Sequence, residues 1–141
     1  MEKALASFAP YAYAILRIVA GLLFVSHGGQ KLFGWFGGQP VPLASLFGVA
    51  AILEIVLGLL ITIGLLTGYA AFVASGEMAV AYFMAHFPKS FWPLENEGEP
   101  AVLFCFIFLY MATQGSGIWS VDAARHRREI EIPVTRRRGH G

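Results

Sequence analysis

Cysteine and charge are both scarce in this chain of 141 residues. Its one cysteine, Cys105, excludes an internal disulfide, a cysteine redox pair and a cysteine-rich metal site. Charged residues make up 13% of the chain and hydrophobic residues 57%, a balance too apolar for a soluble domain of this size. The sequence also lacks a glycine-rich nucleotide-binding loop, a His-Glu-x-x-His metal motif and a serine nucleophile elbow. We therefore expect a membrane protein with no metal and no intrinsic cofactor.

Four apolar stretches predict an all-α fold, an integral membrane antiparallel four-helix bundle within residues 1–122. The turn at Thr67-Gly68 is short enough to place the second and third helices side by side. Arginines near the C-terminal end face an acid-bearing loop at residues 95–99 across an even number of spans, which predicts that both termini are cytoplasmic. The predicted helices cover about 11–33, 46–66, 69–87 and 101–119, with residue 114 as an alternative end of the last one, and a basic, disordered tail follows at 123–141.

Ionisable residues inside these stretches need partners, because a charge at membrane depth costs roughly 2.5–3.5 kcal/mol. With a rise of about 1.5 Å per residue, Arg17 matches Glu77 in depth, which predicts a structural Arg17–Glu77 ion pair. His27 matches Glu54 in the same way, and His27 and Lys31 share the polar face of the first helix with Arg17. The plainer interpretation is that these charges only fix the register of the helices. The residues predicted to line a polar ligand pocket are His27, Lys31, Glu54 and Glu77.

A set of short motifs occurs in a fixed order along the chain. The motifs are Leu16-Arg17, Gly21-Leu22-Leu23-Phe24, His27-Gly28, Lys31-Leu32-Phe33-Gly34, Glu54 with Gly58-Leu59-Leu60, Gly64-Leu65-Leu66-Thr67, Glu77-Met78 with Ala81, Asn96-Glu97-Gly98-Glu99, and Gly115-Ser116-Gly117 with Ser120-Val121-Asp122. As an ordered set they resemble the DoxX family of small four-helix membrane proteins. The resemblance covers nearly the whole chain apart from the basic tail. Gly68 departs from the family pattern, in which a basic residue commonly follows the turn threonine.

The resemblance implies a protein of the bacterial or archaeal cytoplasmic (inner) membrane, of a family often described as oxidoreductases or as subunits of quinone-linked complexes. One hypothesis is therefore a redox-associated subunit whose polar pocket binds a quinone or a similar lipophile. The alternative is a non-catalytic scaffold or stress-related partner protein whose buried charges are structural. Expected partners are membrane lipids and other redox-complex subunits, with homo-oligomers left open. Nucleic acid is not expected, because arginines beside apolar spans indicate topology and contact with anionic lipid headgroups.

Overall fold

The computed structural model describes residues 1–131, and within them it contains helices and no strand. The predicted all-α class is therefore confirmed for this part of the chain. The predicted disordered tail falls partly on residues 132–141, which lie outside the described residues. The elements are α1 (Glu2–Ala6), α2 (Ala9–Phe33), the 3₁₀ turn η1 (Trp35–Gly37), α3 (Leu46–Ile63), α4 (Thr67–Ala81), the π-helical turn η2 (Tyr82–His86), α5 (Pro93–Asn96), α6 (Glu99–Gln114) and α7 (Val121–Glu131).

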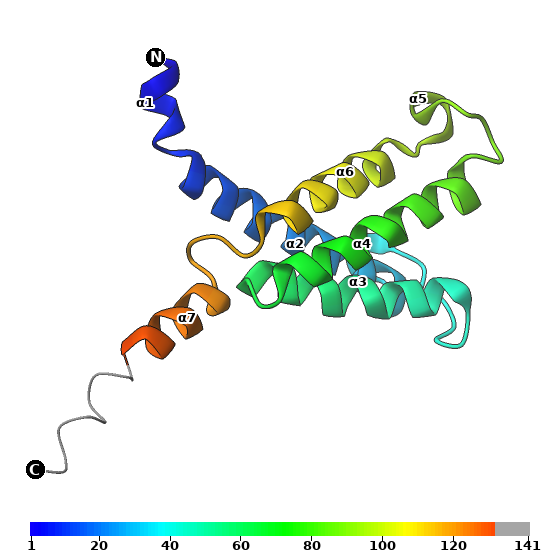
Figure 1. Ribbon diagram of the computed structural model, residues 1–141. Helices are drawn as coiled ribbons and strands as arrows, with labels where there is room; N and C mark the ends of the chain where they lie inside the picture. The colour runs from blue at the N-terminus through cyan, green and yellow to red at the C-terminus, as the bar shows by residue number, and fades with distance from the viewer. Residues whose placement is uncertain (132–141) are drawn as a thin grey trace, which may run out of the picture.

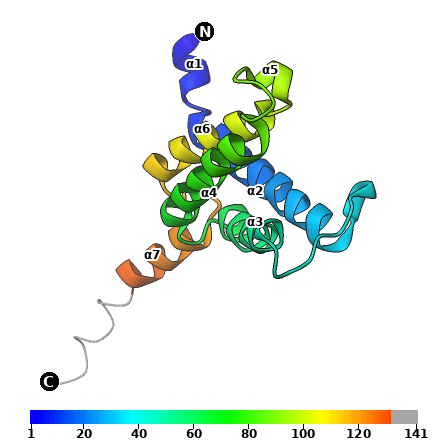
Figure 2. The ribbon, with the colours of Figure 1, turned by 90° about the vertical axis from the view of Figure 1, so that its right-hand side faces the viewer.

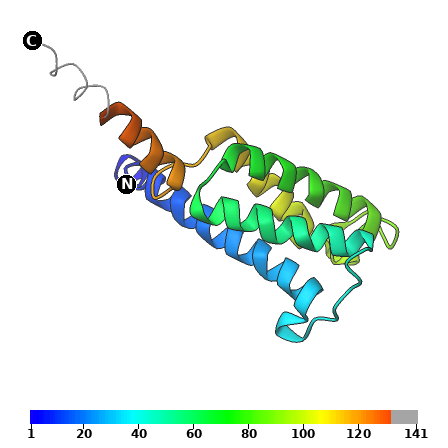
Figure 3. The same cartoon turned by 90° about the horizontal axis from the view of Figure 1, so that it is seen from below.

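The four longest helices lie alongside one another, with α1 and α7 extending from one end (Figure 1). α2 packs mainly against α3, and α4 packs mainly against α6. α3 also contacts α4, so it lies between α2 and α4 (Figure 2). Figure 3 shows α1 and α7 at one end of the molecule and the loops after α2 and after α4 at the other. We call these the terminus end and the loop end.

The ends of the helices follow from local sequence signals. Pro10 stands in the first turn of α2, where a missing N–H costs no hydrogen bond. The Ser45 hydroxyl caps α3 by accepting a 3.0 Å hydrogen bond from the Gly48 N–H. Gly34 ends α2 and Gly64 ends α3, each in the left-handed conformation, with φ of 71° and 72°. Gly64 thereby starts the tight turn that sends α4 back along α3.

The helices approach closely because small residues face each other. A Cβ added to Gly58 would lie 2.8 Å from the carbonyl oxygen of Gly21, so α2 and α3 touch through their backbones at this point. Between α2 and α6, the Phe24 and Phe108 rings pack edge to face with centroids 4.8 Å apart. Both rings are fully buried in the main core. The core therefore holds α2 against α3 through small residues and α2 against α6 through aromatic ones.

Large apolar side chains cover the outside of these helices. Within residues 1–131, two helices are long and apolar enough to cross a membrane on their own, α2 with 25 residues and α3 with 18. α4 continues directly into η2, and α6 is a shorter apolar helix of 16 residues. Exposed side chains include Leu22, Leu23, Val56, Phe72 and Phe106. A surface of this kind is typical of a protein whose surroundings are lipid.

Two expectations about the C-terminal part are wrong. The last predicted helix does not extend to 119 and ends at Gln114, the alternative end, because the glycines at 115 and 117 adopt positive φ angles of 73° and 65° that interrupt helical hydrogen bonding. α7 covers Val121–Glu131, so residues 123–131 are helical where a disordered tail was predicted. The Ser120 hydroxyl accepts a 3.1 Å hydrogen bond from the Ala123 N–H and so caps the start of this helix.

Candidate functional site

Three of the predicted pocket residues form one polar cluster inside the helices, which we call the Lys31–Glu54–Glu77 cluster. The Lys31 ammonium on α2 pairs with Glu54 Oε1 on α3. Glu54 is 1% exposed, and its second oxygen, Oε2, has no hydrogen-bond partner within the described residues. Glu77 on α4 lies within electrostatic range of both Glu54 and Lys31, and both of its carboxyl oxygens are buried and unpartnered there. The cluster thus joins three helices and leaves three acceptor atoms without donors.

The turn between α3 and α4 explains why the two acids meet. Glu54 lies ten residues before Gly64 and Glu77 lies ten residues after Thr67, so both stand about 15 Å from the turn along antiparallel helices. The sequence-based depths placed Glu54 nearer one membrane face and Glu77 nearer the other. The observed turn puts them at the same level, and the long Lys31 side chain reaches them from α2.

His27 lies apart from the cluster. It is exposed on the side of α2 that faces α6, where its ring packs edge to face on Phe104 with centroids 5.7 Å apart. No hydrogen bond joins its ring to another side chain in the described part of the chain. An open apolar groove of about 360 Å³ runs between α2 and α6 beside it, with Leu23, Leu103 and Phe104 among its lining residues. His27 is therefore exposed at the outer surface of the helices and forms no hydrogen bond with the buried acids.

The predicted Arg17–Glu77 ion pair does not form. The Arg17 guanidinium is 0% exposed and donates to two backbone carbonyls of the 115–120 loop, at 2.5 Å to Ser116 and 2.7 Å to Trp119. It lies against Gly64, where an added Cβ would collide with it. Glu77 is ten residues beyond the turn that Gly64 starts, about 15 Å away along α4, which is beyond the reach of the side chain. The prediction assumed that the first and third helices begin at the same depth, whereas α2 begins well before that level.

Hydrogen bonds around Arg17 join α2, α4, α7 and the 115–120 loop at the terminus end. We call this set the Arg17 network; its members are Arg17, Thr67, Ser116, Trp119 and Asp122. The Ser116 hydroxyl donates to Asp122 Oδ2 at 2.6 Å and lies 3.0 Å from the Thr67 hydroxyl. The same Asp122 oxygen accepts from the backbone N–H of Leu66 at 2.8 Å. Sequence analysis gave no role to Ser116 or Asp122. The Gly-Ser-Gly and Ser-Val-Asp motifs were the available signal, since such residues favour turns and helix caps.

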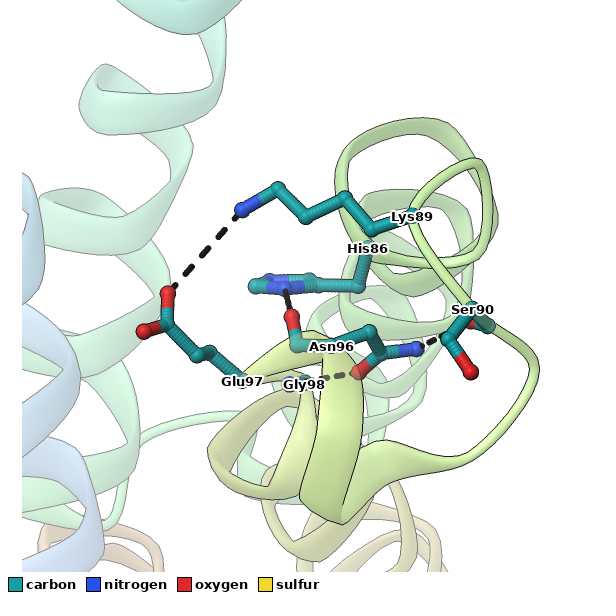
Figure 4. A network of polar contacts seen from close by, with 6 residues as sticks. All are labelled: His86, Lys89, Ser90, Asn96, Glu97 and Gly98. Atoms are coloured by element: carbon teal, nitrogen blue, oxygen red, sulfur yellow. Dashed lines mark hydrogen bonds and ion pairs between the residues drawn. The ribbon is translucent and has the colours of Figure 1, made fainter.

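A second network, at the loop end, fixes the segment between η2 and α6 (Figure 4). Asn96 is fully buried, and its side-chain amide donates to the Ser90 carbonyl at 2.7 Å while its oxygen accepts from the Gly98 N–H at 2.7 Å. His86 Nδ1 lies 3.0 Å from the Asn96 carbonyl oxygen. The hydrogen-bonding groups of Asn96 are satisfied, so this network stabilises the loop. His86 is held there and does not join the Lys31–Glu54–Glu77 cluster.

The three polar regions differ in what they can do chemically. The Asn96 network pairs its donors with acceptors, and the Arg17 network does so except for Arg17 Nε, which has no partner within the described residues. Both networks hold loop backbone in place, so we interpret both as structural. The Lys31–Glu54–Glu77 cluster has more acceptors than donors, with two carboxyl groups and one ammonium in an apolar setting. Buried acceptors of this kind favour a bound group that donates hydrogen bonds. Within residues 1–131 no group of His, Cys, Asp and Glu side chains suits a metal ion.

The described residues form helices and no strand, two of the helices are able to span a membrane, and the outer surface is apolar. These features indicate the class of helical membrane proteins. The DoxX family model matches residues 12–87, just over half of the chain. An uncharacterized protein of Haemophilus influenzae is 38% identical over 125 residues, which cover 84% of this chain and 93% of the relative. An uncharacterized membrane protein of Mycobacterium tuberculosis is 26% identical over 137 residues, covering 84% of each chain. The chain belongs to the DoxX family, as its motifs indicated. No solved structure matches it.

Proposed function

We propose that this DoxX-family protein spans the inner membrane four times, with both termini in the cytoplasm. The support is the common position of α1 and α7 at the terminus end and the sign of the charge at each end of the molecule. Arg125, Arg127 and Arg128 lie at the terminus end, whereas Glu95 and Glu97 lie in the loop segment at the other end. Excess arginine marks the cytoplasmic side of membrane proteins. On this view α4 with η2, and α6, are the third and fourth spans.

We further propose that the Lys31–Glu54–Glu77 cluster binds a small lipophile of the quinone–quinol type, as part of a redox-linked membrane complex. The observation that carries this proposal is the set of three buried carboxyl oxygens without donors, on Glu54 and Glu77. The two hydroxyls of a quinol donate hydrogen bonds, which the carboxylates accept. The Lys31 ammonium donates and suits an oxygen of the oxidised ring. The polar head of such a ligand would satisfy groups that the protein leaves unsatisfied.

His27 was an expected member of this site, and its exposed position makes it a useful control. A His27→Ala change removes an exposed polar side chain from the same helix, one that packs on Phe104 and has no hydrogen bond to the acids. The proposal therefore assigns ligand binding to Lys31, Glu54 and Glu77 alone.

The second candidate function is a non-catalytic scaffold. The ion pair between Lys31 and Glu54 favours it, because such a pair links α2 to α3 whether or not a ligand is present. A scaffold needs its buried charges only for stability. Glu77 forms no ion pair in the described residues, so its replacement distinguishes the two functions. It should weaken ligand binding if the cluster is a ligand site, and a scaffold would show no ligand binding to weaken.

The test is a titration of the full-length protein in nanodiscs with a short-chain quinol, followed by tryptophan fluorescence. We expect saturable binding to the wild type, about tenfold weaker binding to Glu77→Gln, because an amide NH₂ replaces one acceptor oxygen of the carboxyl group, and unchanged binding to His27→Ala. Absence of saturable binding to folded wild-type protein would refute the lipophile site. Equal affinities of the wild type and Glu77→Gln would refute the assigned residues.

A further inference from the structure

An open groove of about 420 Å³ lies at the terminus end, where the 115–120 loop meets α7. It stands apart from the buried acids and contains no residue predicted to bind the lipophile. Its lining combines one tryptophan, the serine that caps α7, two alanines and two arginines. The lining residues are Trp119, Ser120, Ala123, Ala124, Arg127 and Arg128.

Trp119 is held in an unusual conformation at the wall of this groove. Its φ angle is 54°, a left-handed value that a non-glycine residue adopts only when its surroundings hold it there. The Arg17 guanidinium binds its carbonyl oxygen at 2.7 Å, and its ring packs edge to face on Tyr11 with centroids 5.5 Å apart. The side chain nevertheless stays 59% exposed. The surrounding contacts thus fix an exposed indole at the end of the apolar helices, where tryptophan favours the interface between lipid and water.

Arg127 and Arg128 supply positive charge that no ion pair within the described residues neutralises. The ion pairs found within residues 1–131 join Lys31 to Glu54 and Lys89 to Glu97, so neither arginine takes part in one. The nearby Asp122 carboxylate is already bound by Ser116 and by the backbone of Leu66. Both arginines are exposed on α7. Two adjacent guanidinium groups that form no ion pair within the described residues suit a phosphate, which they bind through paired N–H donors.

From this arrangement we propose that the groove binds the phosphate headgroup of one anionic phospholipid from the adjoining leaflet. Arg127 and Arg128 hold the phosphate, while Trp119 and the alanines contact the glycerol and the first acyl carbons. A lipid fits better than a free phosphate ion because an exposed indole and apolar methyl groups line the same groove as the charges. The proposal rests on the proposed membrane location and is independent of the lipophile site.

The test is native mass spectrometry of the full-length protein in detergent, with phosphatidylglycerol and phosphatidylcholine added in equal amounts. We expect the wild type to retain one phosphatidylglycerol in preference to phosphatidylcholine. Arg127→Gln and Arg128→Gln should each weaken the retention of phosphatidylglycerol about tenfold, the effect of one lost charge-assisted contact. Arg125→Gln is the matched control, because it removes the same charge from the same helix but does not line the groove.

Three outcomes would overturn the proposal. Equal losses in Arg125→Gln and Arg127→Gln would show that overall charge attracts the lipid without a defined site. Displacement of the lipid by millimolar inorganic phosphate, without a preference for the lipid, would identify a free-ion site. Equal retention of both phospholipids by folded wild-type protein would show that no headgroup site exists. Quinol binding, measured on Arg127→Gln, should be unchanged, which separates failure here from failure of the lipophile site.

Discussion

Replacement of Arg17 by leucine should destabilise the protein through the 115–120 loop. The guanidinium forms two charge-assisted hydrogen bonds, to the carbonyl oxygens of Ser116 and Trp119. Each hydrogen bond to a charged group contributes about 1.5–3 kcal/mol, so losing both costs about 3–6 kcal/mol. Ser116 is only partly buried, and water can reach its carbonyl once the side chain is gone. We therefore expect a loss of about 3 kcal/mol, at the lower end of that range.

The assay is the free energy of unfolding in mixed micelles of mild detergent and dodecyl sulfate, measured for the wild type, Arg17→Leu and Arg17→Lys. Lysine keeps the charge but presents one ammonium in place of a fork of donors, so it should recover part of the lost stability. Limited proteolysis of the 115–120 loop gives a local readout. Cleavage there should be faster in Arg17→Leu, because this loop is what the guanidinium holds.

A double-mutant cycle with Glu77→Gln tests the alternative partner. The structure separates Arg17 from Glu77, so the cost of Arg17→Leu should be the same in either background, within about 0.5 kcal/mol. An ion pair between them would instead give a coupling of about 0.5–3 kcal/mol, and that result would refute our placement of Arg17. Stability of Arg17→Leu equal to that of the wild type would refute the role of the loop carbonyls.

Two further predictions follow from the helix contacts and from the topology. Gly58→Ala should destabilise the protein by about 1–3 kcal/mol, because the added Cβ would meet the Gly21 carbonyl oxygen. Gly76→Ala is the control: its Cβ would meet nothing within 4 Å, so it should be neutral or stabilise by up to about 1 kcal/mol. Equal effects of the two changes in an unfolding titration would contradict the close α2–α3 contact. Glu95 and Arg125 can each be replaced by a single cysteine in a background without the native cysteine. An impermeant thiol reagent added outside intact cells should label position 95 and leave position 125 unlabelled. Labelling at position 125 alone would reverse the proposed topology.

The helices were predictable because long apolar stretches and glycine or proline boundaries are local signals. The partner of Arg17 was not predictable in the same way. Its acceptors are backbone carbonyls, which every residue carries, and their position depends on how far α2 extends beyond the other helices. The common level of Glu54 and Glu77 depends likewise on the observed position of the α3–α4 turn. α7 did have a signal, since Ser120 is a good capping residue, but the basic composition that follows favoured a tail.

Part of the candidate site could also be predicted from local sequence signals. Charges inside apolar stretches identify polar residues that need partners, and Lys31, Glu54 and Glu77 are indeed brought within range of one another. Sequence position cannot tell which side of a helix meets another helix when both sides are apolar. His27 was therefore grouped with the buried acids although it lies on the exposed side of α2.

The most direct test of the proposed lipophile site is the chemical analysis of what the protein retains on purification. Full-length wild-type protein and Glu77→Gln should be extracted in mild detergent, freed of loosely bound lipid, and their organic extracts compared by mass spectrometry. The proposal predicts a quinone or quinol in a nearly equimolar ratio to the wild-type protein and a clearly lower ratio in Glu77→Gln. Extracts in which both proteins carry only bulk phospholipid, with no enriched quinone, would contradict it.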